Sequence, residues 1–134
     1  MDTSKHIGKM LTVGVDLSEV ARIEALLNRY GDRFRNRVFT EREQVYCNGR
    51  ITSLAGRFAI KEAVAKALGT GIGAVLTWKD IEVVNDDRGK PELVLHNQAQ
   101  TLAHELGLQQ WAISLSHTDS LAIGFVVATG SDQI

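Results

Sequence analysis

Apolar residues recur at helical spacing in the first half of the chain. A repeat of three or four positions from Val20 to Tyr30 predicts a helix over residues 19–30. Ser18 is the N-cap we expect for it, and Gly31 is its expected end. Three further helices are indicated by their caps and apolar repeats, and we expect them over residues 41–47, 54–68 and 98–106.

The caps of those three helices differ in strength. Thr40 and Glu43 have the spacing of a capping box, in which each side chain bonds the other residue's backbone N–H. Ser53 and Asn97 are single polar residues placed before apolar repeats, so we take them as simple N-caps.

Shorter apolar or alternating runs predict β-strands. A turn-rich segment, residues 85–91, separates two of them and predicts a hairpin. The order of strand, three helices, two strands, helix and two strands favours an α+β fold with a mostly antiparallel sheet. No linker interrupts the chain, so we expect an N-terminal tail over residues 1–10 and a single domain over 11–134. The strands are expected over residues 11–16, 80–84, 93–96, 111–116 and 121–128.

The composition is that of an ordinary globular protein. The chain has 134 residues, of which 44% are apolar and 23% charged, and its formal net charge is -1. Its single cysteine, Cys47, excludes an internal disulfide and a cysteine-rich zinc site. Apolar runs are too short to span a bilayer and no secretory signal is recognisable, so we expect a cytoplasmic protein with no membrane contact.

Positive charge is concentrated in one region. Nine of the 15 Lys and Arg residues fall between Arg22 and Lys61. In a nearly neutral chain this predicts a local anionic partner and no general nucleic-acid binding, with a solvated helix face as the alternative. Arg22, Leu26, Arg29 and Arg33 would form a basic strip around one apolar residue.

Two acidic residues are candidates for metal binding or acid–base chemistry. Asp16 directly follows an apolar strand, where a structural turn explains an Asp at least as often as a metal site does. Glu62 precedes Lys66 by one helical turn, and the alternative is an ordinary surface ion pair.

Two further motifs are weaker. The Gly69–Gly73 loop follows a helix, so it lacks the helix N-terminus of a phosphate-binding loop, and an anion there would need Lys or Arg. A flexible helix stop is the alternative. Ser114, Ser116 and His117 offer a conceivable nucleophile pair, but they lack a nucleophile elbow.

Taken together, these motifs resemble the holo-[acyl-carrier-protein] synthases, the small bacterial type of 4'-phosphopantetheinyl transferase. The resemblance spans about residues 11–128 and implies the 4'-phosphopantetheinyl transferase-like α+β fold. The matching stretches, in chain order, are Gly14-Val15-Asp16 with Arg22, the segment from Gly56 to Gly73, the turn from Asn85 to Pro91, and Ser114–His117.

The resemblance implies Mg²⁺-dependent transfer of 4'-phosphopantetheine from coenzyme A to a serine of apo-acyl carrier protein, in fatty acid biosynthesis. Adenosine 3',5'-bisphosphate would be released. Asp16 and Glu62 would hold the Mg²⁺, or Mn²⁺, since both ions suit oxygen ligands. Glu62 would also take the serine proton, directly or through a metal-bound water, and Lys66 would stabilise the departing bisphosphate. Coenzyme A would be bound by Arg57, Lys66, Gly69, Thr70, Gly71, Gly73, His117 and Thr118.

The same resemblance implies two protein partners. An acidic acyl carrier protein would dock on the basic strip, and a homotrimer would have its active sites at subunit interfaces, with the strands after Trp111 near its axis. Two other functions stay open: a metal-dependent phosphohydrolase with the same acids and lysine, and an oligomeric module that only binds an acidic protein. The implied carrier-docking residues are Arg22, Leu26, Arg29, Arg33 and, by likeness alone, Arg37.

Overall fold

Residues 10–130 of the chain are described here from a computed structural model. The predicted tail, residues 1–10, lies outside this range apart from Met10. Within it, no helix is both long and apolar enough to cross a membrane. The elements, in chain order, are β1 (Leu11–Glu19), α1 (Val20–Tyr30), α2 (Asp32–Val38), α3 (Glu41–Cys47), α4 (Ile51–Ala67), the 3-10 turn η2 (Trp78–Asp80), β2 (Ile81–Asn85), β3 (Pro91–Leu95), α5 (Asn97–Glu105), β4 (Gln110–His117) and β5 (Leu121–Thr129).

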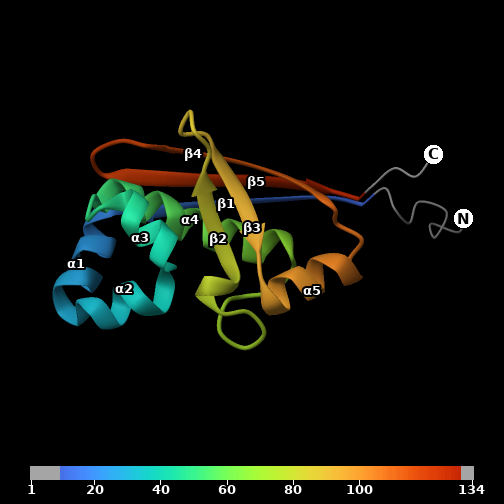
Figure 1. Ribbon diagram of the computed structural model, residues 1–134, viewed down its shortest axis with the longest axis horizontal. Helices are drawn as coiled ribbons and strands as arrows, with labels where there is room; N and C mark the ends of the chain where they lie inside the picture. Colours follow the sequence, from blue (N-terminus) through green and yellow to red (C-terminus); the bar gives the residue numbers. More distant parts are fainter. Residues whose placement is uncertain (1–9, 131–134) are drawn as a thin grey trace, which may run out of the picture.

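The strands form two antiparallel sheets. One has the order β1-β5-β4, and the other is the β2–β3 hairpin around the predicted turn. Figure 1 shows the three-stranded sheet along one side of the molecule and the helices gathered on the other. The α+β class and the antiparallel pairing predicted from the sequence are therefore confirmed.

Three of the predicted N-caps are wrong. Ser18 belongs to β1, because pairing with β5 continues to Glu19 opposite Leu121, and Glu19 caps α1 with backbone geometry alone. Ser53 and Asn97 lie inside α4 and α5. The strand and helix hydrogen bonds extend past these polar residues, which single-residue cap signals do not reveal.

The capping box predicted for α3 is confirmed. Glu43 N donates to Thr40 Oγ1 at 3.2 Å, and Thr40 N donates to Glu43 Oε1 at 2.9 Å. Two backbone donors at the start of a short helix are thereby satisfied.

Helix α2 was not predicted. Gly31 has a φ of 55° and ends α1 as expected, but α2 begins at the next residue. The chain therefore changes direction between Arg29 and Arg33, and the predicted basic strip is divided between two helices.

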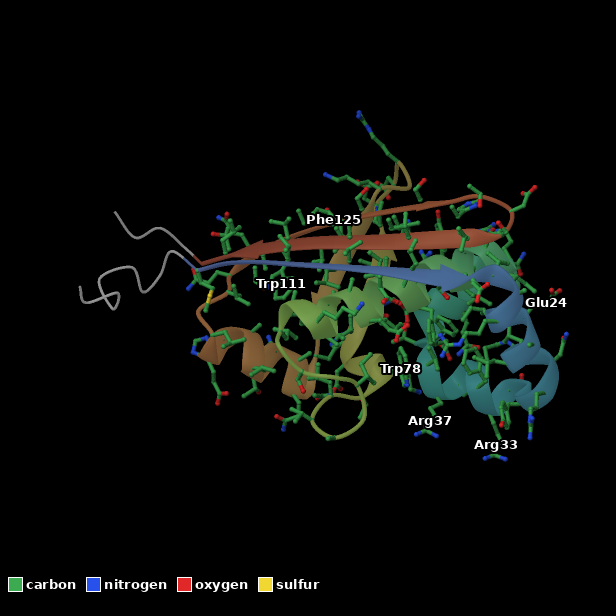
Figure 2. All side chains as sticks on the ribbon, turned by 180° about the vertical axis from the view of Figure 1, so that it is seen from behind. Glu24, Arg33, Arg37, Trp78, Trp111 and Phe125 are labelled. Carbon is green, nitrogen blue, oxygen red and sulfur yellow. The ribbon has the colours of Figure 1, made fainter. Side chains whose placement is uncertain are left out.

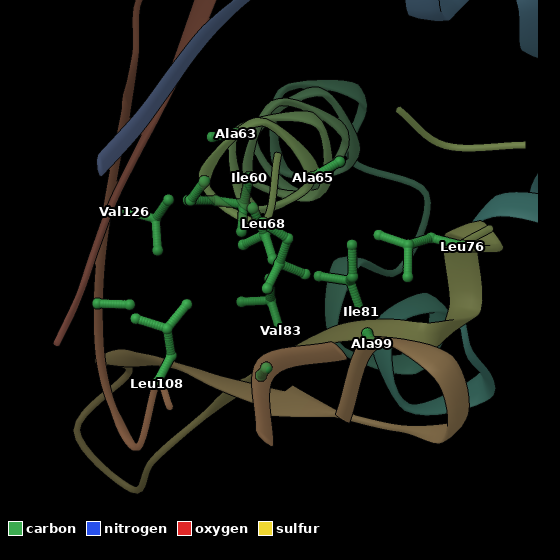
Figure 3. Close-up of a cluster of buried hydrophobic side chains, with 14 residues drawn as sticks. Ile60, Ala63, Ala65, Leu68, Leu76, Ile81, Val83, Ala99, Leu108 and Val126 are labelled. Carbon is green, nitrogen blue, oxygen red and sulfur yellow. The ribbon is translucent and has the colours of Figure 1, made fainter. Parts of the chain in front are cut away.

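Helix α4 is central in the core. Its apolar residues, including Ile60 and Val64, pack between the three-stranded sheet, represented by Val126, and the hairpin, represented by Val83. Figure 3 shows this cluster with α4 above Val83 and Val126 to one side. Because residues on several faces of α4 are buried, few of its positions are left for polar chemistry.

Two glycines let α4 approach the three-stranded sheet backbone to backbone. A Cβ atom at Gly14 would lie 2.0 Å from the carbonyl oxygen of Ala63, and one at Gly124 would lie 2.6 Å from the nitrogen of Ile60. Gly124 is paired directly with Asp16 across β1 and β5. The close approach therefore sets the distance between Asp16 and the helix beside it.

A buried ion pair fixes the opposite side of α4. Lys61 and Glu43 are both fully buried, with 2.8 Å between Lys61 Nζ and Glu43 Oε1. Lys61 also donates to the carbonyls of Trp78 and Ile81, and Glu43 Oε2 accepts from Val83 N at 3.0 Å. The pair joins α3, α4, η2 and β2, and its polar atoms are well supplied with partners, as a buried charge requires.

Gly124→Ala is expected to lower the free energy of unfolding by about 2 kcal/mol or more, because its methyl group would overlap α4 backbone that is fixed on its other side. Denaturant unfolding at one protein concentration measures the loss. Gly71→Ala is the matched control, since a Cβ at Gly71 meets no atom within 4 Å. Equal stability of the two variants would contradict the close approach.

Candidate active site

Two carboxyl groups from distant parts of the sequence meet beside β1. Asp16 points from the face of β1 that packs on α4, and Glu62 lies on α4 one residue before Ala63, which contacts Gly14. Asp16 and Glu62 therefore lie close enough for the charge of one carboxyl to act on the other. The structure thus brings together the two acids that the sequence analysis assigned to one site.

The proximity of the two acids changes the acidity of Glu62. Burial, followed by the negative charge of Asp16 and by the hydrogen bonding to Asp16 that favours a protonated Glu62, raises the pKa of Glu62 to about 7. Arg22 and Lys66 act in the opposite direction. Two acidic side chains this close to each other mark a place where a cation would be favourable.

Lys66 supplies a positive charge at this place. Its Nζ donates to Asp16 Oδ1 at 2.7 Å and to the carbonyl oxygen of Val15 at 3.1 Å. The bond to Asp16 and the charge of that residue raise the pKa of the Lys66 ammonium. Lys66 and Glu62 are thus not the isolated surface pair of the alternative interpretation, because both also interact with Asp16.

The pair of acids fits a divalent cation in its donor chemistry. Mg²⁺ and Mn²⁺ prefer oxygen ligands, and Mg²⁺ commonly takes only one or two carboxylates and completes its shell with water or substrate phosphates. Asp16 and Glu62 provide that number. Across residues 10–130 no group of three or more His, Cys, Asp and Glu side chains is placed to hold a metal, so further ligands would come from outside the chain's acids.

Arg22 connects the acids to a cavity on α1 and α2. Its guanidinium lies 5.4 Å from the centroid of the Phe58 ring, and Phe58 is one turn before Glu62 on α4. Phe58 stacks on Trp78 with 4.6 Å between ring centroids. The cavity has a volume of about 390 Å³ and is lined by Arg22, Leu26, Tyr30, Arg33, Phe34, Arg37, Val38, Phe58 and Trp78.

Most of the predicted docking residues face this cavity, but one does not. Arg33 and Arg37 both line it, and Figure 2 shows their side chains pointing away from the ribbon, below Trp78 in the view. Leu26 is partly buried and also lines it. Arg29 is outside the lining, with its guanidinium 5.3 Å from the centroid of the Tyr30 ring.

Arg57 has a different environment from the one expected of an exposed phosphate ligand. It is 2% exposed, donates a hydrogen bond to Asn85, and lies 4.6 Å from the centroid of the Tyr46 ring. Asn85 in turn donates to the carbonyl of Gly89 at 3.0 Å. Within one chain, Arg57 thus supports the hairpin turn, and its Nε is buried with no partner among the described residues.

The remaining predicted coenzyme A residues are in two exposed places. Gly69, Thr70, Gly71 and Gly73 form the loop that leaves α4, and Gly69 has a φ of 79° as it ends the helix. His117 ends β4, and Thr118 follows it in the turn to β5. Within residues 10–130 we find no hydrogen bond from these two groups to Asp16 or Glu62.

Three features of the site were missed in the sequence. Arg22 lines the cavity and its charge also acts on Glu62. Phe58 and Trp78 stack on each other where they line the cavity. Lys61 forms an ion pair with Glu43. The spacing of Phe58 and Glu62, one helical turn apart, is a signal that was available. No local pattern pairs Phe58 with Trp78 or Lys61 with Glu43.

Comparison with known proteins gives consistent results. Residues 12–126 match the family model of the 4'-phosphopantetheinyl transferase superfamily. The holo-[acyl-carrier-protein] synthase of Herpetosiphon aurantiacus is 49% identical over 127 residues, which are 90% of this chain and 100% of the relative.

Two solved structures share the fold. The holo-[acyl-carrier-protein] synthase of Helicobacter pylori in complex with coenzyme A has a TM-score of 0.79 and 34% identity, over 87% of this chain and 98% of that one. The synthase of Bacillus anthracis in complex with CoA (3',5'-ADP) has a TM-score of 0.73 and 38% identity, over 90% of this chain and 96% of that one.

Asp16→Asn is expected to lower the pKa of Glu62 from about 7 toward its ordinary value of 4.5, because the facing negative charge is lost while the burial remains. NMR titration of the glutamate side-chain carboxyls in metal-free protein measures the change. Lys66→Gln is the opposite control: it removes a positive charge and should raise the same pKa. An unchanged Glu62 pKa in Asp16→Asn would show that the two acids do not meet.

Proposed function

Since the chain belongs to the 4'-phosphopantetheinyl transferase superfamily, we propose that it is a holo-[acyl-carrier-protein] synthase. It transfers 4'-phosphopantetheine from coenzyme A to a serine of apo-acyl carrier protein, in the cytoplasm and in fatty acid biosynthesis. The observation that carries the proposal is the pairing of Asp16 with Glu62 next to Lys66 and next to a cavity lined by arginines.

Asp16 and Glu62 are the residues we assign to Mg²⁺, with Mn²⁺ as an alternative. The bound ion would offset negative charge on the diphosphate of coenzyme A during phosphoryl transfer. Asp16 is suited to a fixed position because its strand is held to α4 through Gly14. The released product would be adenosine 3',5'-bisphosphate, and the Bacillus anthracis relative was crystallised with a ligand described as CoA (3',5'-ADP).

Glu62 and Lys66 have separate tasks in this proposal. Glu62 accepts the proton of the carrier serine, so that the serine oxygen can attack the phosphorus atom. Lys66 lies one turn further along α4, is 58% exposed, and can reach a phosphate of the departing bisphosphate with its flexible side chain. Glu62 therefore acts on the attacking serine, and Lys66 acts on the leaving bisphosphate.

The coenzyme A contacts are assigned by family likeness. The Gly69–Gly73 loop, with Thr70 and Gly71, together with His117 and Thr118, offers exposed backbone and side-chain donors for the phosphates and nucleotide. Arg57 is buried, so its contribution would come from its charge and from the hairpin turn it supports through Asn85.

The cavity on α1 and α2 is the docking surface we propose for the carrier. Its arginines suit an acidic protein, and its apolar residues suit contacts between side chains. The cavity begins at Arg22, next to Glu62, so a carrier docked there would place its serine near the acids. Arg22, Leu26, Arg33 and Arg37 are the assigned contacts, and Arg29 would act only from the rim.

We also propose a homotrimer with active sites at subunit interfaces. The face of the three-stranded sheet opposite α4 is apolar and exposed: Val15 lies beside Phe125, and Leu17 lies beside Ile123. An exposed apolar face of this kind marks a protein interface. Because β1 is an edge strand, a neighbouring copy packed on the apolar face could extend past the edge that bears Asp16 and supply a second wall for coenzyme A. Sedimentation equilibrium tests the trimer, and a fully active monomer would contradict shared sites.

Incubation with coenzyme A, Mg²⁺ and apo-acyl carrier protein should add one phosphopantetheine to the carrier, as measured by intact mass spectrometry. Asp16→Ala and Glu62→Ala are each expected to slow transfer by at least about a hundredfold, since each removes a proposed metal ligand. Circular dichroism checks that both variants fold. Wild-type rates in the folded variants would contradict the metal assignment.

The same assay separates the other functions. Cleavage of coenzyme A without modification of the carrier would indicate a phosphohydrolase. Stable carrier binding with neither reaction would indicate a binding module.

Arg33→Gln is expected to raise the KM for the carrier about fivefold at low salt with little change in kcat, because Arg33 lines the cavity away from the acids. Arg35→Gln is the matched control: it removes the same charge from the same helix, but Arg35 is outside the cavity lining and pairs with Asp32. The wild-type KM should also rise with ionic strength. Equal effects of the two substitutions would argue against docking at the cavity.

A further inference from the structure

The Lys66 ammonium lies among the oxygen atoms that a cation at this site would use. It is 2.7 Å from Asp16 Oδ1 and 3.1 Å from the carbonyl oxygen of Val15. Glu62 lies on the neighbouring α4, one residue before Ala63, whose carbonyl oxygen faces Gly14 of the same strand as Asp16. An ammonium and a divalent ion both seek such oxygens, so they cannot share Asp16 without strong repulsion.

The Lys66 side chain is free to move away from the acids, whereas the Asp16 side chain is held in position. The Lys66 side chain is 58% exposed, whereas that of Asp16 is 15% exposed. Asp16 is fixed by the pairing of β1 with β5 and by the contact of Gly14 with α4. The lysine ammonium is carried on a flexible four-carbon side chain, so it can move by several ångströms into solvent while the acids stay in position.

We propose that Lys66 acts as a resident cation of the Asp16–Glu62 pair and that binding of a divalent ion displaces its ammonium toward solvent. The inference rests on the proposed function, in which this pair holds the metal. It adds that the charge at the acids is held by the chain itself until the ion arrives. The displaced ammonium is then free to meet the phosphates of coenzyme A, so Lys66 would serve two sites in succession.

The proposal predicts that Lys66 weakens metal binding in the absence of substrate. Replacing it by a neutral side chain vacates Asp16 Oδ1 and removes the competing ammonium. Lys66→Gln should therefore bind Mn²⁺ about tenfold more tightly than wild type, which corresponds to about 1.4 kcal/mol. Lys66→Arg keeps a charged donor and should bind Mn²⁺ as weakly as wild type.

A control variant separates displacement from general electrostatics. Arg22 also acts on Glu62 through its charge, but the described chain shows no hydrogen bond from Arg22 to either acid. Arg22→Gln should tighten Mn²⁺ binding only about twofold, and 0.5 M KCl should remove that effect because exposed charges are screened. The effect of Lys66→Gln should persist at 0.5 M KCl, since it arises from a vacated ligand position.

Electron paramagnetic resonance of free Mn²⁺, titrated into metal-free protein without coenzyme A, measures these affinities. Equal Mn²⁺ affinity of wild type and Lys66→Gln would overturn the proposal, and so would equal tightening by Arg22→Gln at both salt concentrations. Absence of Mn²⁺ binding in all variants would overturn it too. The transfer assay on the wild-type enzyme tests the proposed function separately, so an active transferase with no Lys66 effect would disprove the displacement alone.

Discussion

The close approach of α4 to the three-stranded sheet is the constraint on which the site depends. Gly14 and Gly124 leave no Cβ between the backbones, and the groups they would otherwise meet belong to Ala63 and Ile60 on α4. A strand residue and a helix residue normally stand farther apart, with side chains packed between them. Here the missing side chains let Asp16 reach Glu62, so two glycines without chemistry of their own determine where the chemistry is possible.

The Lys61–Glu43 pair adds a second constraint on the orientation of α4, beside the packing of its buried faces. Burial lowers the pKa of the Lys61 ammonium, and the ion pair with Glu43 opposes this. Breaking such a pair leaves a buried charge without a partner, which costs about 3–5 kcal/mol, so the helix keeps the face that bears Lys61 toward α3. Since Glu62 is the next residue, its direction toward β1 follows. The buried Lys61–Glu43 pair therefore helps to orient Glu62 toward β1.

The sequence predicts the elements better than it predicts their contacts. The capping box at Thr40 and the hairpin turn were predicted because both are local patterns of polar and turn residues. Helix α2 was not predicted because Gly31 indicates the end of a helix, and because seven residues are too few for a clear apolar repeat. The meeting of Asp16 and Glu62 was expected only from family resemblance. The Lys61–Glu43 pair, 18 residues apart, follows no periodicity and could not be read from the chain.

The placement of the acids explains why a nearly neutral chain carries such an uneven charge. Glu62 lies one turn after Phe58, which lines the arginine-rich cavity, while β1, which bears Asp16, presents Val15 and Leu17 on its other face. Uncompensated acids at this border would repel an acidic or phosphorylated substrate. Lys66 and Arg22 offset their charge locally, and the arginines further along α1 and α2 extend a positive field away from the site. The charge of the region is thus arranged so that the acids can bind a cation without turning anionic substrates away.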